Sequence, residues 1–126
     1  MRILDWRLDL LVGAIFLTGC LGGKTLPFYP AATGGDVQSG KALIVEYRCG
    51  ACHEIPGIRN AHGQFGPPLD YFGSTTYIAG VIPNNPENLV HWIQSPTSIK
   101  PKTTMPVLGL SEQQARDVAA YLETLQ

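Results

Sequence analysis

Residues 49–53 have the sequence Cys-Gly-Ala-Cys-His, and this pentapeptide decides how the rest of the chain is interpreted. In this spacing, both thiols can add to the two vinyl groups of one haem, and the next residue brings an imidazole under the iron as an axial ligand. The two small residues between the cysteines let the backbone turn tightly against the porphyrin edge. The motif therefore predicts a covalently attached haem, with Cys49 and Cys52 as the attachment residues and His53 as a metal ligand.

Three other interpretations of the motif are weaker. A thioredoxin-like redox pair needs a βαβ setting, and the surrounding sequence lacks one. A zinc site needs a second ligand pair at suitable spacing, whereas His62 and His91 are single and far apart. A structural disulfide between the two cysteines would leave His53 without a role. Haem attachment is the interpretation that uses all three residues.

The second axial ligand has to come from elsewhere in the chain. Apart from Met1, the only methionine is Met105. It lies in a polar, proline-flanked loop from Pro96 to Pro106, where an apolar core residue would rarely be placed. A thioether is a soft ligand that favours reduced iron. We therefore predict Met105 as the second metal ligand, with His91 as the rival.

The first thirty residues indicate export and membrane attachment. Arg2 and Arg7 precede a short apolar stretch that is too short to span a bilayer but fits a secretory signal. The stretch ends in Leu-Thr-Gly-Cys, which resembles the lipobox of bacterial lipoproteins. We predict a signal peptide over residues 1–19, lipidation of Cys20, and a flexible tether over residues 20–34. The alternatives are an ordinary secretory signal that leaves the protein soluble in the periplasm, or an uncleaved anchor.

Length and composition limit the remaining possibilities. The chain has 126 residues, enough for one domain. Its net charge is −1, and its lysines and arginines are scattered, which argues against nucleic-acid binding. The 14 glycines and 10 prolines lie mostly in the middle of the chain, which indicates long loops between helices. Alternating strand patterns are hard to find, so an all-α fold is expected.

Four further segments make the chain similar to class I, mitochondrial-type, monohaem cytochromes c. They lie at 35–41, 66–69, 86–95 and 111–125, and together with the haem motif they span most of residues 35–126, the predicted haem domain. The resemblance implies a small all-α fold with three to five helices wrapped around one haem c. It also implies that the carbonyl of Pro67 accepts a hydrogen bond from the imidazole of the proximal histidine.

Local signals support the helices that this resemblance implies. Asp36 is a suitable N-cap for the first helix, and Ser111 with Gln114 forms a predicted capping box for the last. In the family, the last helix crosses the first where a glycine meets an aromatic side chain. Gly40 and Tyr121 are the candidates for that pair.

The expected function is single-electron transfer in a respiratory or dehydrogenase-linked chain, on the periplasmic side of a bacterial membrane. The end of the motif set also resembles haem domains attached to terminal oxidases and dehydrogenases. Expected partners are a terminal oxidase, a quinol-oxidising complex or a dehydrogenase. Neither a nucleophile nor a general base is evident, so no catalysis is expected. The alternatives are a fixed haem subunit and a haem enzyme or gas sensor with a displaceable ligand. Lys100 and Lys102 are either part of a docking rim or solvated loop charges.

Overall fold

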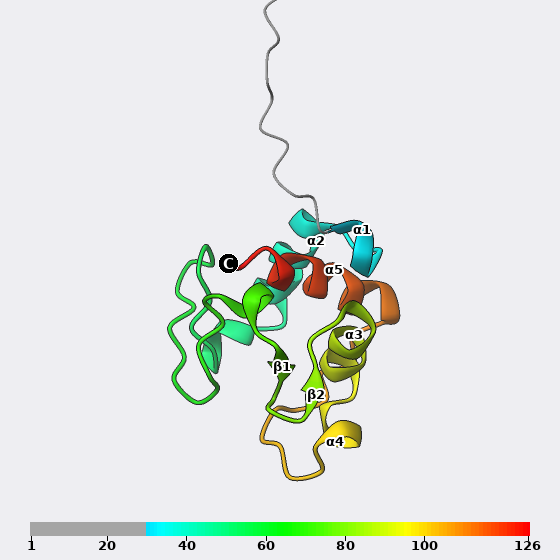
Figure 1. The fold of residues 1–126 in the computed structure, drawn as a ribbon. Helices are drawn as coiled ribbons and strands as arrows, with labels where there is room; N and C mark the ends of the chain where they lie inside the picture. The colour runs from blue at the N-terminus through cyan, green and yellow to red at the C-terminus, as the bar shows by residue number, and fades with distance from the viewer. Residues whose placement is uncertain (1–29) are drawn as a thin grey trace, which may run out of the picture.

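The computed structural model describes residues 30–126, and in this range the fold consists of helices joined by long loops (Figure 1). The α-helices are α1 (Pro30–Thr33), α2 (Val37–Glu46), α3 (Pro86–Gln94), α4 (Pro96–Ile99) and α5 (Glu112–Glu123). Two 3₁₀ turns, η1 (Cys49–Ala51) and η2 (Phe72–Ser74), and one hairpin, β1 (Tyr77–Ile78) with β2 (Ile82–Pro83), lie between α2 and α3. The predicted small all-α fold is confirmed. The predicted signal peptide 1–19 and lipidation site Cys20 lie outside the described residues.

Helices α2 and α5 begin where the sequence predicts, because side chains satisfy the amides of their first turns. Asp36 accepts a hydrogen bond from the amide of Ser39 at 2.7 Å. That bond favours the charged carboxylate and lowers the pKa of Asp36. Ser111 and Gln114 form both hydrogen bonds of a capping box, at 3.2 and 2.9 Å.

Helix α3 also has a local explanation. Asn85 caps it by accepting a hydrogen bond from the amide of Asn88 at 2.9 Å, and Pro86 occupies the first turn, where no amide is needed. The helix ends at Gln94, one residue before the predicted end, and α4 follows directly. The predicted loop from Pro96 to Pro106 therefore contains one helical turn at its start.

Helices α2 and α5 cross at Gly40, which is buried. A Cβ on Gly40 would lie 2.5 Å from the carbonyl carbon of Asp117 and 3.1 Å from the amide nitrogen of Val118. The two backbones can approach this closely only because Gly40 has no side chain. The expected pairing of Gly40 with Tyr121 stays a prediction; the atoms nearest to a Cβ on Gly40 belong to Asp117 and Val118, about one turn before Tyr121. Tyr121 instead donates a hydrogen bond to the carbonyl of Pro56 at 2.7 Å.

Helix α1 lies within the segment predicted as a flexible tether, and its end is packed into the fold. Thr33 is fully buried, and its carbonyl accepts a hydrogen bond from Nη1 of Arg116 at 2.9 Å. The carbonyl of Gly34 accepts one from Nε2 of Gln113 at 3.2 Å. Both donors are on α5, more than 75 residues away in sequence. Residues 33–34 therefore belong to the folded domain, which begins before the predicted boundary at residue 35.

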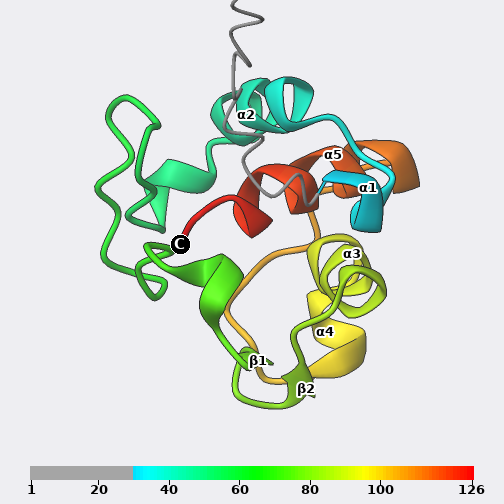
Figure 2. The ribbon, with the colours of Figure 1, turned by 45° about the horizontal axis from the view of Figure 1, so that its top comes forward.

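The core lies around α5, which Figure 2 shows between α2 and α3. Apolar side chains from every long helix and from the loops meet there. The buried members of the cluster are Ile44, Ile55, Ile58, Ala61, Leu69, Ile78, Leu89, Val90, Ile93, Leu110, Ala115, Val118, Ala119, Tyr121 and Leu122. Among residues 30–126, none of the helices has the length and apolar character needed to cross a bilayer.

A tight turn that the sequence analysis did not predict joins β1 to β2. The amide of Val81 donates to the carbonyl of Ile78 at 3.0 Å, and the two residues between them, Ala79 and Gly80, have φ angles of 51° and 73°. Two positive φ values in succession are typical of a type I′ turn, and the pairing of Ile78 with Ile82 leaves residues 79–81 as the loop of the hairpin. The turn therefore holds the carbonyl of Ala79 in a fixed position at the tip of the hairpin.

Candidate functional site

The candidate site begins at the pentapeptide of residues 49–53, which folds as one tight turn. Its first three residues form η1, and the amides of Cys52 and His53 both donate to the carbonyl of Cys49, at 3.1 and 3.0 Å. Arg48 precedes the turn and adopts a left-handed backbone conformation, with φ of 55°. The chain therefore changes direction between α2 and η1. The turn brings two thiols and one imidazole together on five consecutive residues.

Both thiols of this turn are free, and their surroundings differ. Cys49 is partly buried against the apolar core, and Cys52 is exposed. Burial raises the pKa of the Cys49 thiol, and the neighbouring Cys52 adds to the increase. Free thiols one turn apart are what thioether attachment to two vinyl groups requires, so the pair fits a covalent haem.

Glycines in the turn and beside it allow close packing. A Cβ on Gly50 would lie 2.6 Å from the Cβ of Ala61. A Cβ on Gly63 would lie 2.5 Å from the carbonyl carbon of Ala51, and the amide of Gly63 donates to the carbonyls of Gly50 and His53 at 3.1 and 3.2 Å. The loop of residues 61–63 therefore packs against the turn and is hydrogen-bonded to it.

The imidazole of His53 is oriented by a single hydrogen bond. Its Nδ1 lies 2.7 Å from the carbonyl oxygen of Pro67. Because a carbonyl only accepts, Nδ1 carries the proton, and Nε2 keeps its lone pair when the ring is neutral. Among residues 30–126, nothing bonds to Nε2. The geometry thus presents one nitrogen that is ready to bind a metal, and the hydrogen bond implied by the resemblance is present.

Gly66 holds the loop of Pro67 against the imidazole. A Cβ on Gly66 would lie 2.7 Å from Nδ1 and 2.9 Å from Nε2 of His53, closer than an ordinary contact. The amide of Gly66 donates to the carbonyl of Cys52 at 2.7 Å. Residues 66–69 are part of the resemblance, which gave a role only to Pro67. The close approach of Gly66 to the imidazole is seen only in the structure.

Met105 lies on a separate loop, which leaves α4 and returns to α5 at the end of the molecule opposite α1 and α2 (Figure 1). The side chain is half-buried. The amide of Met105 donates to Oγ1 of Thr103 at 3.2 Å, and the amide of Thr103 donates to the carbonyl of Lys100 at 2.9 Å. The loop therefore has its own internal hydrogen bonds and is not an extended linker.

The rival ligand His91 has another partner. It is exposed on α3, and its Nε2 lies 3.0 Å from Oγ of Ser98 on α4. His62 is also exposed and pairs with Glu54 in an isolated β-bridge. Within the described range 30–126, no cluster of three or more His, Cys, Asp and Glu side chains could hold a metal ion.

Apolar side chains that are only partly buried pack against the core. They include Leu43, Tyr47, Phe72, Ile82, Trp92, Leu108 and Leu125. Phe65, next to Gly66, is 79% exposed. A flat apolar ring such as a porphyrin can pack on surfaces of this kind, and the donor set of residues 49–53 would hold it at one edge.

Known proteins resemble this chain over most of its described residues. The family model for cytochrome c matches residues 37–126. Similar curated proteins are named cytochrome c oxidase subunit 2: the protein of Alkalihalophilus pseudofirmus is 36% identical over 90 residues, which cover 71% of this chain and 25% of the relative. That of Bacillus subtilis is 32% identical over 108 residues, which cover 82% of this chain and 30% of the relative. The chain thus spans less than a third of the length of either relative.

Proposed function

The chain belongs to the cytochrome c family, as a class I member, and from this we propose that it carries single electrons on one haem c with His53 and Met105 as axial ligands. Covalent haem c and haem-based electron transfer characterise the family. When bound, the haem iron supplies a reversible one-electron couple between its ferric and ferrous states. Cys49 and Cys52 are the proposed thioether residues.

The observation that carries the proposal is the hydrogen bond from His53 to Pro67. With Nδ1 donating to the carbonyl at 2.7 Å, the ring has one orientation and one tautomer, and its Nε2 lone pair is available to iron. Gly66 supports the same orientation, because its backbone lies against the ring. A proximal ligand held in this way does not need to reorganise when the iron changes its oxidation state.

Met105 is proposed as the second residue that would hold the haem iron. It is half-buried on a loop with internal hydrogen bonds, whereas the exposed His91 is bonded to Ser98. A soft thioether favours the ferrous state and raises the reduction potential. With both residues bound to the iron, no position would be left for a substrate. We therefore propose a carrier and not an enzyme.

The names of the relatives suggest a partner. Both of those compared are cytochrome c oxidase subunit 2, so we propose a terminal oxidase as the redox partner. A quinol-oxidising complex and a dehydrogenase are the other proposed classes of partner. They would donate electrons to the chain, and the oxidase would accept them. Weak redox encounters use small, transient interfaces that charge helps to orient.

Export and attachment remain proposals that rest on the sequence. We propose that residues 1–19 are a signal peptide and that lipid on Cys20 holds the haem domain at the periplasmic side of a bacterial membrane. Replacing Cys20 with alanine should leave haem binding intact and move the protein from the membrane fraction to the soluble fraction. Membrane retention of Cys20→Ala would contradict the lipid anchor.

The test of the haem ligands is a spectrum of the protein produced with haem-attachment machinery. A reduced-minus-oxidised spectrum of a c-type haem and a mass increase of one haem are expected. Met105→Ala should lose the weak red-end ferric band that marks sulfur ligation, and the reduced variant should bind carbon monoxide. Val107→Ala is the matched control, because Val107 is on the same loop and is 56% exposed. A colourless product, or a band that survives Met105→Ala, would contradict the proposal.

A further inference from the structure

The loop that carries Met105 is joined to a distant part of the chain by one side chain. Nζ of Lys100 donates a hydrogen bond to the carbonyl of Ala79 at 3.1 Å, across 21 residues of sequence. We infer that Lys100 is a positioning residue that keeps the Met105 loop in its closed position. This inference rests on the proposed function, in which Met105 is the sixth ligand.

Two hydrogen bonds connect Lys100 to Met105. The carbonyl of Lys100 accepts from the amide of Thr103 at 2.9 Å, and Oγ1 of Thr103 accepts from the amide of Met105 at 3.2 Å. The backbone of Lys100 is itself tied to α4, because its amide donates to the carbonyl of Pro96 at 2.9 Å. A displacement of Lys100 would therefore move the Met105 backbone through these two hydrogen bonds.

The acceptor of the Lys100 bond is well placed to resist movement. The carbonyl of Ala79 is at the tip of the type I′ turn, and the turn is closed by the separate bond between Val81 and Ile78. Ile78 is 1% exposed and belongs to the core. A charged ammonium that donates to such a carbonyl forms a stronger bond than a neutral donor would.

The other side of α4 is tied to α3. Oγ of Ser98 donates to the carbonyl of Ser95 at 2.7 Å, which uses its only proton. The same oxygen lies 3.0 Å from Nε2 of His91, so it accepts there and the histidine donates. Ser98 is bonded to α3, and Lys100 is bonded to the hairpin. Hydrogen bonds therefore hold α4 in place on two sides, and the Met105 loop starts from α4.

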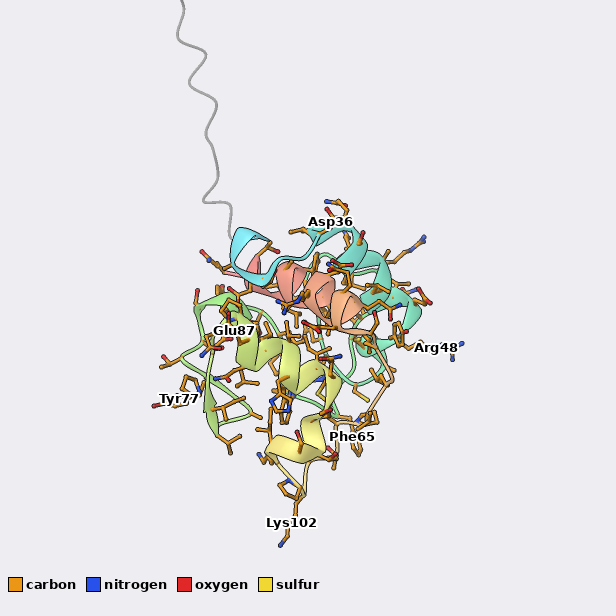
Figure 3. All side chains as sticks on the ribbon, turned by 90° about the vertical axis from the view of Figure 1, so that its right-hand side faces the viewer. Asp36, Arg48, Phe65, Tyr77, Glu87 and Lys102 are labelled. Atoms are coloured by element: carbon orange, nitrogen blue, oxygen red, sulfur yellow. The ribbon has the colours of Figure 1, made fainter. Side chains whose placement is uncertain are left out.

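Lys102 provides a contrast on the same loop. Its side chain points away from the protein at the outer end of the loop (Figure 3), and among residues 30–126 nothing bonds to it. Removing either lysine changes the charge of the loop by the same amount. Only the removal of Lys100 also removes a hydrogen bond, so a difference between the two variants isolates that bond.

The experiment measures how readily Met105 leaves the iron. Imidazole is titrated into the ferric holoprotein, and loss of the sulfur-ligation band gives its apparent affinity, which rises with the fraction of molecules whose loop is open. Losing one hydrogen bond should increase that fraction roughly two- to tenfold in Lys100→Leu. Lys102→Leu should resemble the wild type, and Lys100→Arg, which keeps a charged donor, should restore most of the wild-type affinity.

The outcomes distinguish the positioning role of Lys100 from the proposed ligation by Met105. Equal imidazole affinities for Lys100→Leu and Lys102→Leu would overturn the positioning role while leaving Met105 as the ligand. A wild-type protein without the sulfur-ligation band, and unchanged by Met105→Ala, would overturn the proposed ligation and the positioning role together. Tighter imidazole binding in Lys100→Leu alone, reversed in Lys100→Arg, supports both.

Discussion

Replacing Gly66 with alanine should disturb the proximal ligand directly. An ideal Cβ at this position lies 2.7 Å from Nδ1 of His53, whereas ordinary contacts begin at 3.4 Å. The imidazole and the loop must therefore separate by at least about 0.7 Å, the difference between these two distances, because Cε1 of the same ring lies closer still. Movement in that direction lengthens the bond between His53 and Pro67, which is 2.7 Å in the native fold.

Two terms set the size of the effect. Forcing a methyl group into a close-packed site costs about 1–3 kcal/mol. Weakening the hydrogen bond to Pro67 costs a further ~0.5–1.5 kcal/mol. The free energy of unfolding of Gly66→Ala should therefore fall by about 1.5–4.5 kcal/mol. Each kcal/mol lowers the Tm of a domain of this size by roughly 4–8 °C.

The assay combines thermal unfolding of the holoprotein with NMR detection of the His53 Nδ1 proton and its exchange with water. Gly73→Ala is the matched control, because its Cβ would lie 2.9 Å from the carbonyl carbon of Glu123, in a comparable clash that does not involve the imidazole. Both variants should lose stability, but only Gly66→Ala should accelerate exchange of the Nδ1 proton. Wild-type stability and proton exchange in Gly66→Ala would refute the reasoning.

Three further predictions concern the core and the C-terminal helix. Gly40→Ala should lower the unfolding free energy by about 1–3 kcal/mol in denaturant titrations, despite the intrinsic helix preference of alanine, because the new Cβ meets the Asp117 backbone; an unchanged midpoint would contradict the close crossing. Tyr121→Phe should cost about 0.5–1.5 kcal/mol through loss of its bond to Pro56. Burial raises the pKa of Tyr121 above 10.0, so wild-type stability should fall as pH rises past 10.0, and a variant that shows the same alkaline fall would argue against this phenol as its source. Burial also raises the pKa of Glu123 above 4.5, so Glu123→Gln should be more stable than the wild type at neutral pH, with a gain that disappears as pH falls below 4.5; a gain independent of pH would point to another cause.

The parts of the fold that the sequence predicted are those with local causes. Asp36 and Ser111 mark helix starts, because the side chain of each accepts a hydrogen bond from an amide three residues later. Pro86 marks the start of α3 for another local reason: it occupies the first helical turn, where no amide is needed. The packing of residues 33–34 escaped prediction because its partners, Arg116 among them, are on α5. No local pattern reports a contact between the two ends of a domain.

The candidate site shows the same division. The turn of Cys49 and His53 is determined by five adjacent residues, and Pro67 followed from the resemblance. The hairpin escaped prediction because Ala79 occupies a left-handed position that usually takes asparagine, aspartate or glycine, so its sequence gives a weak turn signal. The bond from Lys100 then could not be foreseen, since its acceptor exists only once that turn has formed.

The packing of α1 sets how far the haem domain can travel. If Cys20 is lipidated as proposed, ten residue steps separate the bilayer from Pro30, and a chain of that length reaches at most about 33–36 Å. A free segment up to residue 35 would reach about 50 Å, which corresponds to roughly a threefold larger search volume. The contacts of Thr33 and Gly34 shorten the chain between the proposed lipid anchor and the folded domain. They would therefore concentrate the carrier near partners in the same membrane. Partners whose electron entry site lies farther from the membrane surface would be out of reach.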